Sequence, residues 1–120
     1  MRLLAAIVLT ATLVLLSGGP GAAQEQFRLT FHRQADEPTS LVLAGTLSNE
    51  GSRDVVDVWV GAEALNARGR VVGRGLAFVS PLLRSRGDTK FTVKLPRVEQ
   101  VESFRVFVSS FRYLAGAESP

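Results

Sequence analysis

The amino-acid sequence predicts an all-β fold, an antiparallel β-sandwich of about six or seven strands preceded by an N-terminal signal helix. After residue 25, apolar and polar residues alternate with a period of two in several short segments, as is typical of half-buried strands. Turn-forming residues separate these segments at intervals of about 8 to 12 residues. Because such short strands are not stable singly, two sheets must share one apolar interior. A small barrel is the alternative.

The first 23 residues have the composition of a secretory signal peptide. Arg2 supplies a positive charge, residues 3–16 are apolar apart from two threonines, and residues 17–23 are small and turn-forming. We expect cleavage after Ala23 and a mature domain over residues 24–120. A retained membrane anchor is the alternative, but the apolar run is shorter than the roughly 20 residues that a bilayer core requires. A lipoprotein is excluded because the chain has no cysteine to acylate.

The first two strands are predicted at residues 26–32 and 40–48. In both segments, large apolar side chains alternate with small or polar ones. Pro38 lies in the break between them, since proline cannot donate to a strand ladder. Gly45 lies in the middle of the second strand, where glycine costs stability. Its usual compensation is the close approach of another backbone or of a large side chain.

A turn that contains Asn49 and Gly51 leads into the third strand, which is predicted at residues 55–66. Both turn residues are of a type that tolerates positive φ. Valine and alanine alternate along the third strand with larger or polar side chains. Gly69 is the natural left-handed position of a tight hairpin, so the fourth strand returns antiparallel over residues 71–79.

A longer loop follows, in which we expect Leu82 and Leu83 to point inward beneath a polar crossing. The fifth strand is predicted at residues 89–95 and ends at a proline, and the last at residues 103–114. Alternation in the last strand places two apolar sets on opposite faces: Phe104, Val106 and Val108 on one, and Phe107, Phe111 and Tyr113 on the other. This pattern indicates an interior strand or a strand whose outer face meets a partner.

The charge of the chain is low and scattered. The sequence carries 14 basic and 11 acidic side chains, and removal of the leader with Arg2 leaves 13 against 11, a net charge of about +2. A nucleic-acid surface needs clustered basic residues interleaved with aromatic ones, so nucleic acid is not an expected partner. Membrane contact is expected only through an uncleaved leader. An exported chain without cysteine fits a bacterial envelope protein, periplasmic or secreted.

Turn and core positions along nearly the whole mature chain resemble those of FxLYD-type and related bacterial immunoglobulin-like domains. The F-x-L-Y-D string itself is absent, and its nearest counterpart is the segment FRYL at residues 111–114. The resemblance implies an exported immunoglobulin-like β-sandwich with an adhesive or scaffolding role. The matching positions form three groups: Gly45, Leu47, Asn49 and Gly51; Asn66, Gly69 and Val71; and Leu83, Gly87 and Phe91.

The sequence offers no set of residues suited to catalysis or metal binding. His32 is the single histidine, and without cysteine a zinc site lacks ligands. The carboxylates of Asp36 and Glu37, and those of Asp54 and Asp57, lie at no recognised calcium-loop spacing. No serine lies in a G-x-S-x-G turn. We therefore expect no enzymatic activity, no cofactor and no metal ion.

Four aromatic residues are the candidates for partner binding: Trp59, Phe107, Phe111 and Tyr113. Strict alternation in the third strand puts Val56 inward and Trp59 outward, where an aromatic side chain can anchor a partner. A bulge would reverse the face, and sandwiches often pack a strand tryptophan in the core, so both placements of Trp59 stay open. The other three side chains either extend an apolar outer patch or lie under a loop.

These observations favour a non-catalytic exported immunoglobulin-like domain that mediates protein–protein interaction or scaffolding in the bacterial cell envelope. The partner would contact an aromatic face or add a strand at an open sheet edge. The alternative is a small-molecule or glycan-binding domain, which requires a concave pocket lined by Trp59, Tyr113 and arginines. A third hypothesis is a structural accessory that contacts only its own copies.

Overall fold

The computed structural model describes residues 26–114 and arranges them in six antiparallel strands and two sheets, which confirms the all-β prediction. Within this part of the chain no helix is long and apolar enough to cross a membrane. The predicted signal helix and cleavage site lie outside the described residues. The strands are β1 (Phe27–Arg33), β2 (Ser40–Asn49), β3 (Val55–Leu65), β4 (Val71–Leu83), β5 (Asp88–Pro96) and β6 (Ser103–Tyr113).

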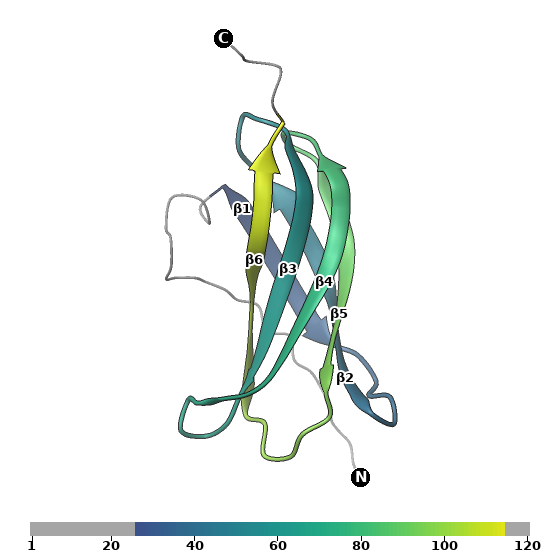
Figure 1. Cartoon of the computed structure of the whole chain (residues 1–120), viewed down its shortest axis with the longest axis vertical. Coiled ribbons are helices and arrows are strands. Elements are labelled where there is room, and N and C mark those ends of the chain that lie inside the picture. The colour runs from purple at the N-terminus through teal and green to yellow at the C-terminus, as the bar shows by residue number, and fades with distance from the viewer. Residues whose placement is uncertain (1–25, 115–120) are drawn as a thin grey trace.

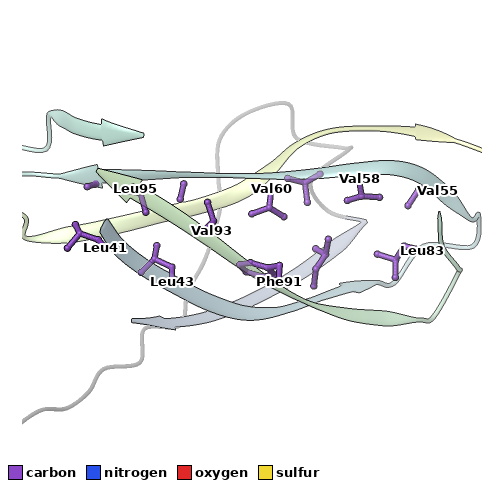
Figure 2. Packing of buried hydrophobic residues seen from close by; sticks show 13 residues of the cluster. Leu41, Leu43, Val55, Val58, Val60, Leu83, Phe91, Val93 and Leu95 are labelled. Carbon is purple, nitrogen blue, oxygen red and sulfur yellow. The ribbon is translucent and has the colours of Figure 1, made fainter. Parts of the chain in front are cut away.

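The two sheets have the strand orders β1-β2-β5 and β4-β3-β6, and they face each other as two layers (Figure 1). Figure 2 shows side chains of both sheets meeting between the layers, with Leu43 of β2 and Val60 of β3 among them. Burial of a valine or leucine side chain stabilises a fold by about 1.5–3 kcal/mol, so the shared interior is the main source of stability. It consists of Leu41, Leu43, Leu47, Val55, Val58, Val60, Ala62, Ala64, Leu83, Phe91, Val93, Leu95 and Val108.

Strand β4 is longer than the sequence predicted. It continues to Leu83 instead of ending at residue 79, and it includes Pro81 because an edge strand tolerates a residue without an N–H group. The expectation that Leu82 and Leu83 both point inward is half wrong. Leu83 is buried in the core, whereas Leu82 is exposed, as alternation within a strand requires.

The two layers approach each other most closely where β4 passes β5. A Cβ atom at Gly75 of β4 would lie 2.2 Å from the main-chain carbonyl oxygen of Lys94 in β5, so only glycine allows this approach. Gly45 fulfils the prediction made for it in a similar way: a Cβ atom there would lie 1.9 Å from the carbonyl oxygen of Thr30 in the neighbouring strand β1.

On the opposite side of the molecule, side chains bridge β1 and β6. The rings of Phe27 and Phe111 meet edge to face with their centroids 5.0 Å apart. The hydroxyl group of Tyr113 donates to Oε1 of Gln26 at 2.6 Å. These contacts join the start of β1 to the end of β6, and no described strand pairs with either of these edges.

Asn49, the last residue of β2, is fully buried and organises one end of the molecule. Its Nδ2 donates to the carbonyl oxygens of Arg53 at 2.9 Å and Leu83 at 3.2 Å. Its Oδ1 accepts from the N–H of Gly51 at 3.0 Å and from Nε2 of Gln26 at 3.1 Å. One amide therefore ties together the start of β1, the turn after β2 and the end of β4.

The turn chemistry predicted for this segment is corrected by the structure. Among the described residues, positive φ occurs at Asp57, Arg86, Gln100 and Gly69 and not at Asn49 or Gly51. Asn49 is needed for its four hydrogen bonds, because a buried amide without partners is costly. The hairpin prediction at Gly69, with φ of 78°, is confirmed.

Replacement of Asn49 tests this arrangement. We expect Asn49→Ala to lower the free energy of unfolding by about 3 kcal/mol, because the buried carbonyl of Leu83 loses its donor. Asn66→Ala is the matched control, since the Asn66 side chain accepts two hydrogen bonds in an exposed turn. We expect it to cost about 1 kcal/mol or less. Urea unfolding followed by circular dichroism gives both values, and equal losses would contradict the role assigned to Asn49.

A glycine pair in β4 tests the close approach of the sheets. Gly75→Ala places a methyl group against the Lys94 carbonyl and is expected to lower the free energy of unfolding by about 2 kcal/mol. Gly73→Ala, two residues away, meets nothing closer than 3.8 Å and is expected to change it by less than about 0.5 kcal/mol. Thermal melting of the two variants side by side measures the difference. A Gly75→Ala protein as stable as the control would contradict the packing described for β4 and β5.

Candidate functional site

The outward surface of the β4-β3-β6 sheet carries a group of large apolar side chains, which we call the outer aromatic face. It consists of Trp59 of β3, Leu76 and Phe78 of β4, and Phe107 of β6. Leu76 is 60% exposed and Phe78 48% exposed, and none of the four belongs to or packs against the core cluster. This sheet lies in front of β1 and β2 in Figure 1.

Strand register brings these four side chains together. Trp59 pairs with Phe78, and Gly61 pairs with Leu76 on one side and with Phe107 on the other. Residues directly opposite each other in neighbouring strands project to the same face. The indole ring and the Phe78 ring meet edge to face, with centroids 5.3 Å apart and an interplanar angle of 68°.

An irregularity at Asp57 sets the direction of these side chains. Asp57 has φ of 53°, and the pairing of β3 with β6 shifts between Val56 and Trp59. As a result Val55 and Val58, which lie three residues apart, are both fully buried. The predicted inward placement of Val56 is therefore wrong, whereas Trp59 lies on the outer face as alternation indicated. The question left open for Trp59 is settled in favour of the surface.

Gly61 gives the outer aromatic face its continuity. A Cβ atom at this position would lie 2.8 Å from the ring of Phe107. The phenyl ring of Phe107 therefore lies over the backbone of β3, close to the row that contains Leu76. A larger residue at position 61 would push this ring away from the sheet.

Ion pairs border the outer aromatic face at both ends. At one end Glu63 of β3 lies between Arg74 of β4, with Nε–Oε2 of 3.6 Å, and Arg105 of β6, whose Nε donates at 3.0 Å. At the other end Arg112 of β6 pairs with Asp57. The Glu63 side chain is 15% exposed and that of Arg105 is 60% exposed, so the border presents mainly positive charge to solvent.

The structure separates the aromatic residues of β6 that the sequence placed on one face. The register of β6 shifts at Ser109, between the residues that pair with Val60 and with Trp59. Phe107 therefore lies on the outer aromatic face, while Phe111 packs against the core. Of the four predicted contact residues, the structure brings Trp59 and Phe107 together and places the other two elsewhere.

Tyr113 belongs to a separate cluster near the end of β6. Its ring meets the Phe111 ring edge to face, with centroids 5.3 Å apart. The guanidinium carbon of Arg53 lies 4.0 Å from the centroid of the tyrosine ring, which is a favourable cation–π geometry. Tyr113 thus closes the end of the molecule and is remote in register from Leu76 and Phe78.

Sequence inspection missed Leu76 and Phe78. Both alternate with Ala77 and Val79 within β4, so the apolar pattern alone does not say which pair faces the core. The larger pair is the exposed one. The available indication was the neighbouring Gly75, which marks the inward face as the place of close backbone approach.

A groove lies at the end of the molecule opposite Tyr113. It is lined by charged and apolar residues, among them Arg33, Asp36, Leu41, Pro96 and Arg97. Neither Trp59 nor Tyr113 contributes to it. The concave pocket that the glycan-binding hypothesis required from those two residues is therefore not formed by this groove. Within residues 26–114, no three His, Cys, Asp or Glu side chains gather in a way that could hold a metal ion.

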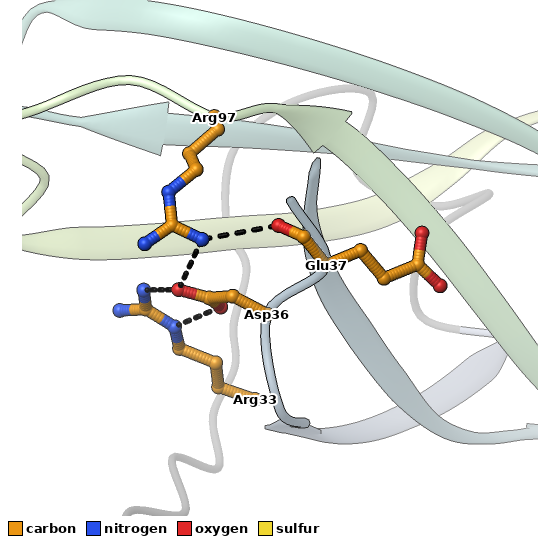
Figure 3. A network of polar contacts seen from close by, with 4 residues as sticks. All are labelled: Arg33, Asp36, Glu37 and Arg97. Atoms are coloured by element: carbon orange, nitrogen blue, oxygen red, sulfur yellow. Dashed lines mark hydrogen bonds and ion pairs between the residues drawn. The ribbon is translucent and has the colours of Figure 1, made fainter. Parts of the chain in front are cut away.

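Asp36 is held by two arginines beside this groove (Figure 3). Arg33 donates to both of its carboxylate oxygens, at 3.2 and 2.9 Å, and Arg97 lies 3.6 Å away. Arg97 also donates to the carbonyl oxygen of Glu37 at 3.0 Å. The hydrogen bond from Arg33 lowers the pKa of Asp36, with help from the charges of both arginines and against the opposing effect of desolvation. The Asp36 carboxylate therefore joins the end of β1 to the residue that follows β5.

A scan against protein-family models and searches of curated proteins and of solved structures found no match to this chain. The resemblance to FxLYD-type domains therefore stays a prediction based on the turn and core positions.

The pKa shift of Asp36 predicts a pH-dependent contribution to stability. A carboxyl group with a lowered folded-state pKa stabilises the fold above its unfolded pKa of about 3.9 and loses that effect as the pH falls through the folded value. We expect Asp36→Asn to be less stable than the native chain at pH 7, with the difference shrinking below about pH 4. Chemical unfolding at pH 7, 5, 4 and 3 measures it. A constant difference across this range would contradict the ion pairing.

Proposed function

We propose that this chain is a non-catalytic, exported immunoglobulin-like domain that binds a protein partner in the bacterial envelope through its outer aromatic face. The observation that carries the proposal is the exposure of Leu76 and Phe78 beside Trp59 and Phe107 on an otherwise well-packed sheet. Protein interfaces combine an apolar, aromatic centre with a polar border, and tryptophan is among their most frequent energetic anchors. The arginine–carboxylate pairs at both ends of the face supply such a border.

Strand order supports the immunoglobulin-like part of the proposal. In immunoglobulin sandwiches, strands A, B and E share one sheet, and C′, C and F are neighbours in the other. The orders β1-β2-β5 and β4-β3-β6 correspond to A-B-E and C′-C-F when the strands are lettered along the chain. Export is proposed from the leader-like composition of the first 23 residues.

The pairing of the carboxylates near the outer aromatic face favours binding over catalysis. Glu63 and Asp57 both form ion pairs with arginines of the same sheet. A general acid or base needs a carboxyl group that is within hydrogen-bond reach of a substrate proton. Paired carboxylates instead provide the fixed charges that orient a partner.

Site-specific cross-linking tests the proposal. A photo-reactive amino acid is placed at Leu76 on the outer aromatic face, and as a control at Thr92, which is exposed on β5 of the other sheet. We expect irradiation in the envelope fraction of the source cells to yield a protein adduct from position 76 and not from position 92. Loss of an interface tryptophan costs about 2 kcal/mol or more, so Trp59→Ala should reduce the adduct strongly.

Circular dichroism of each variant establishes that it is folded. The same adducts from both positions, or an unchanged adduct in Trp59→Ala, would show that the outer aromatic face is not the binding surface.

A further inference from the structure

The groove at the end of the molecule opposite Tyr113 is separate from the outer aromatic face. It is lined by residues of the loop between β1 and β2 and by residues 97–99, which follow β5. No side chain of the outer aromatic face contributes to its lining. Its volume is about 670 Å³, which is in the range of small-molecule sites. A ligand in this groove would therefore bind independently of a partner on the outer aromatic face.

Two arginines in the groove share one carboxylate. Nη2 of Arg33 lies 2.9 Å from Oδ2 of Asp36, and Nη1 of Arg97 lies 3.6 Å from the same oxygen. Glu99 also lines the groove, but within residues 26–114 it forms no ion pair. Two guanidinium groups are thus paired with a single carboxylate, and the cluster keeps an excess of positive charge.

Contacts within the protein fix the orientation of both guanidinium groups. Arg33 donates through Nε and Nη2 to the two oxygens of Asp36, and its guanidinium carbon lies 5.6 Å from the centroid of the Phe104 ring. Arg97 donates from Nη1 to the carbonyl oxygen of Glu37 at 3.0 Å. Side chains that are already held in place lose less conformational freedom when a ligand binds.

Both arginines keep unused donors. A guanidinium group has five N–H donors. In the described part of the chain, Nη1 of Arg33 and Nη2 of Arg97 make no hydrogen bond or ion pair. Figure 3 shows these free ends on the same side of the cluster, turned away from Asp36. The two side chains are 45% and 51% exposed, so a ligand from solvent can reach both donors.

The charges of the groove favour a carboxylate over a phosphate as the ligand group. Guanidinium donors match the oxygens of either group. However, Asp36 and Glu99 both line the groove, and they repel a phosphate group more strongly because it carries more negative charge than a carboxylate. The lining also includes the apolar side chains of Pro38, Pro96 and Val98, which suit an apolar group attached to the carboxylate.

We infer that this groove binds a carboxylate that is joined to a small apolar group. Arg33 and Arg97 hold the carboxylate through their free N–H groups, and Asp36 keeps the two arginines in position. Val98 and the neighbouring prolines contact the apolar group. This chemistry occurs in free carboxylic acids and at the C-terminus of a peptide that ends in an apolar residue.

NMR titration of the isotope-labelled protein tests the inference. We expect N-acetyl-leucine to shift the amide signals of residues 33–41 and 97–99, with a Kd in the millimolar range because exposed ion pairs are weak. N-acetyl-leucinamide lacks the carboxylate and should leave these signals unchanged, and inorganic phosphate should bind more weakly than the acid. The peptide Ala-Ala-Ala-Leu distinguishes the two sources: tighter binding than N-acetyl-leucine identifies a peptide C-terminus, and weaker binding identifies a free acid.

Variants of the groove assign the binding to named side chains. Arg33→Gln and Arg97→Gln should each weaken the binding of N-acetyl-leucine about fivefold. Arg97→Lys should weaken it too, because lysine keeps the charge but not the planar pair of donors. Glu99→Gln removes an opposing charge and should strengthen binding about twofold. The control Arg84→Gln removes an exposed arginine between β4 and β5 and should have no effect.

The amide spectrum of each variant establishes that it is folded. Binding of the amide as tight as that of the acid, or of phosphate tighter than the acid, would overturn the assignment of a carboxylate. Unchanged affinity in both Arg33→Gln and Arg97→Gln, or shifts confined to the outer aromatic face, would overturn the site. None of these results bears on the proposed function, which depends on Trp59 and its neighbours.

Discussion

The burial of both Val55 and Val58 in β3 is the constraint on which the arrangement of the whole sheet depends. Strict alternation would expose one of them, and the positive φ at Asp57 allows both to reach the core. A non-glycine residue in this conformation costs about 1 kcal/mol, and aspartate is among the residues that adopt it most readily. Burial of each valine stabilises the fold by about 1.5 kcal/mol or more. This exceeds the cost of the positive φ at Asp57, so the irregular backbone is favoured.

The same irregularity connects the core to the surface. Beyond Asp57, the inward positions of β3 are occupied by valine and alanine, and Trp59 is left on the outside beside Phe78. Asp57 itself is paired with Arg112 of β6, so the residue that adjusts the core also marks one end of the outer aromatic face. At the same end of the sheet, Asn49 joins the turn after β2 to the end of β4. The core packing of β3 and the surface charge at one end of the outer aromatic face therefore both depend on Asp57.

The sequence predicted the all-β class and the bounds of β1, β2, β3, β5 and β6 to within about one residue, because alternating burial leaves a visible period of two. It failed where that period breaks. The register shifts at Asp57 and Ser109 leave no recognisable pattern in the sequence. The predicted inward placement of Val56 and the predicted shared face of Phe107 and Phe111 were therefore wrong. In β4 both faces are apolar. Leu76 and Phe78 are exposed because the other face of the strand, which carries Gly75, is the one that approaches β5. Export, partner and family stay predictions.

Gly61 indicates that the side chains of the outer aromatic face are packed in a specific arrangement. A glycine inside a strand lowers stability by about 0.5–1 kcal/mol relative to alanine, and at this position no core contact requires it. The atoms that a Cβ would meet belong to the Phe107 ring, which lies on the outside. The sheet thus loses some stability and keeps the Phe107 ring over the backbone of β3, between two ion-paired ends. An apolar sheet face with charged borders suits a protein partner better than it suits an enclosed small molecule, for which a concave site is needed.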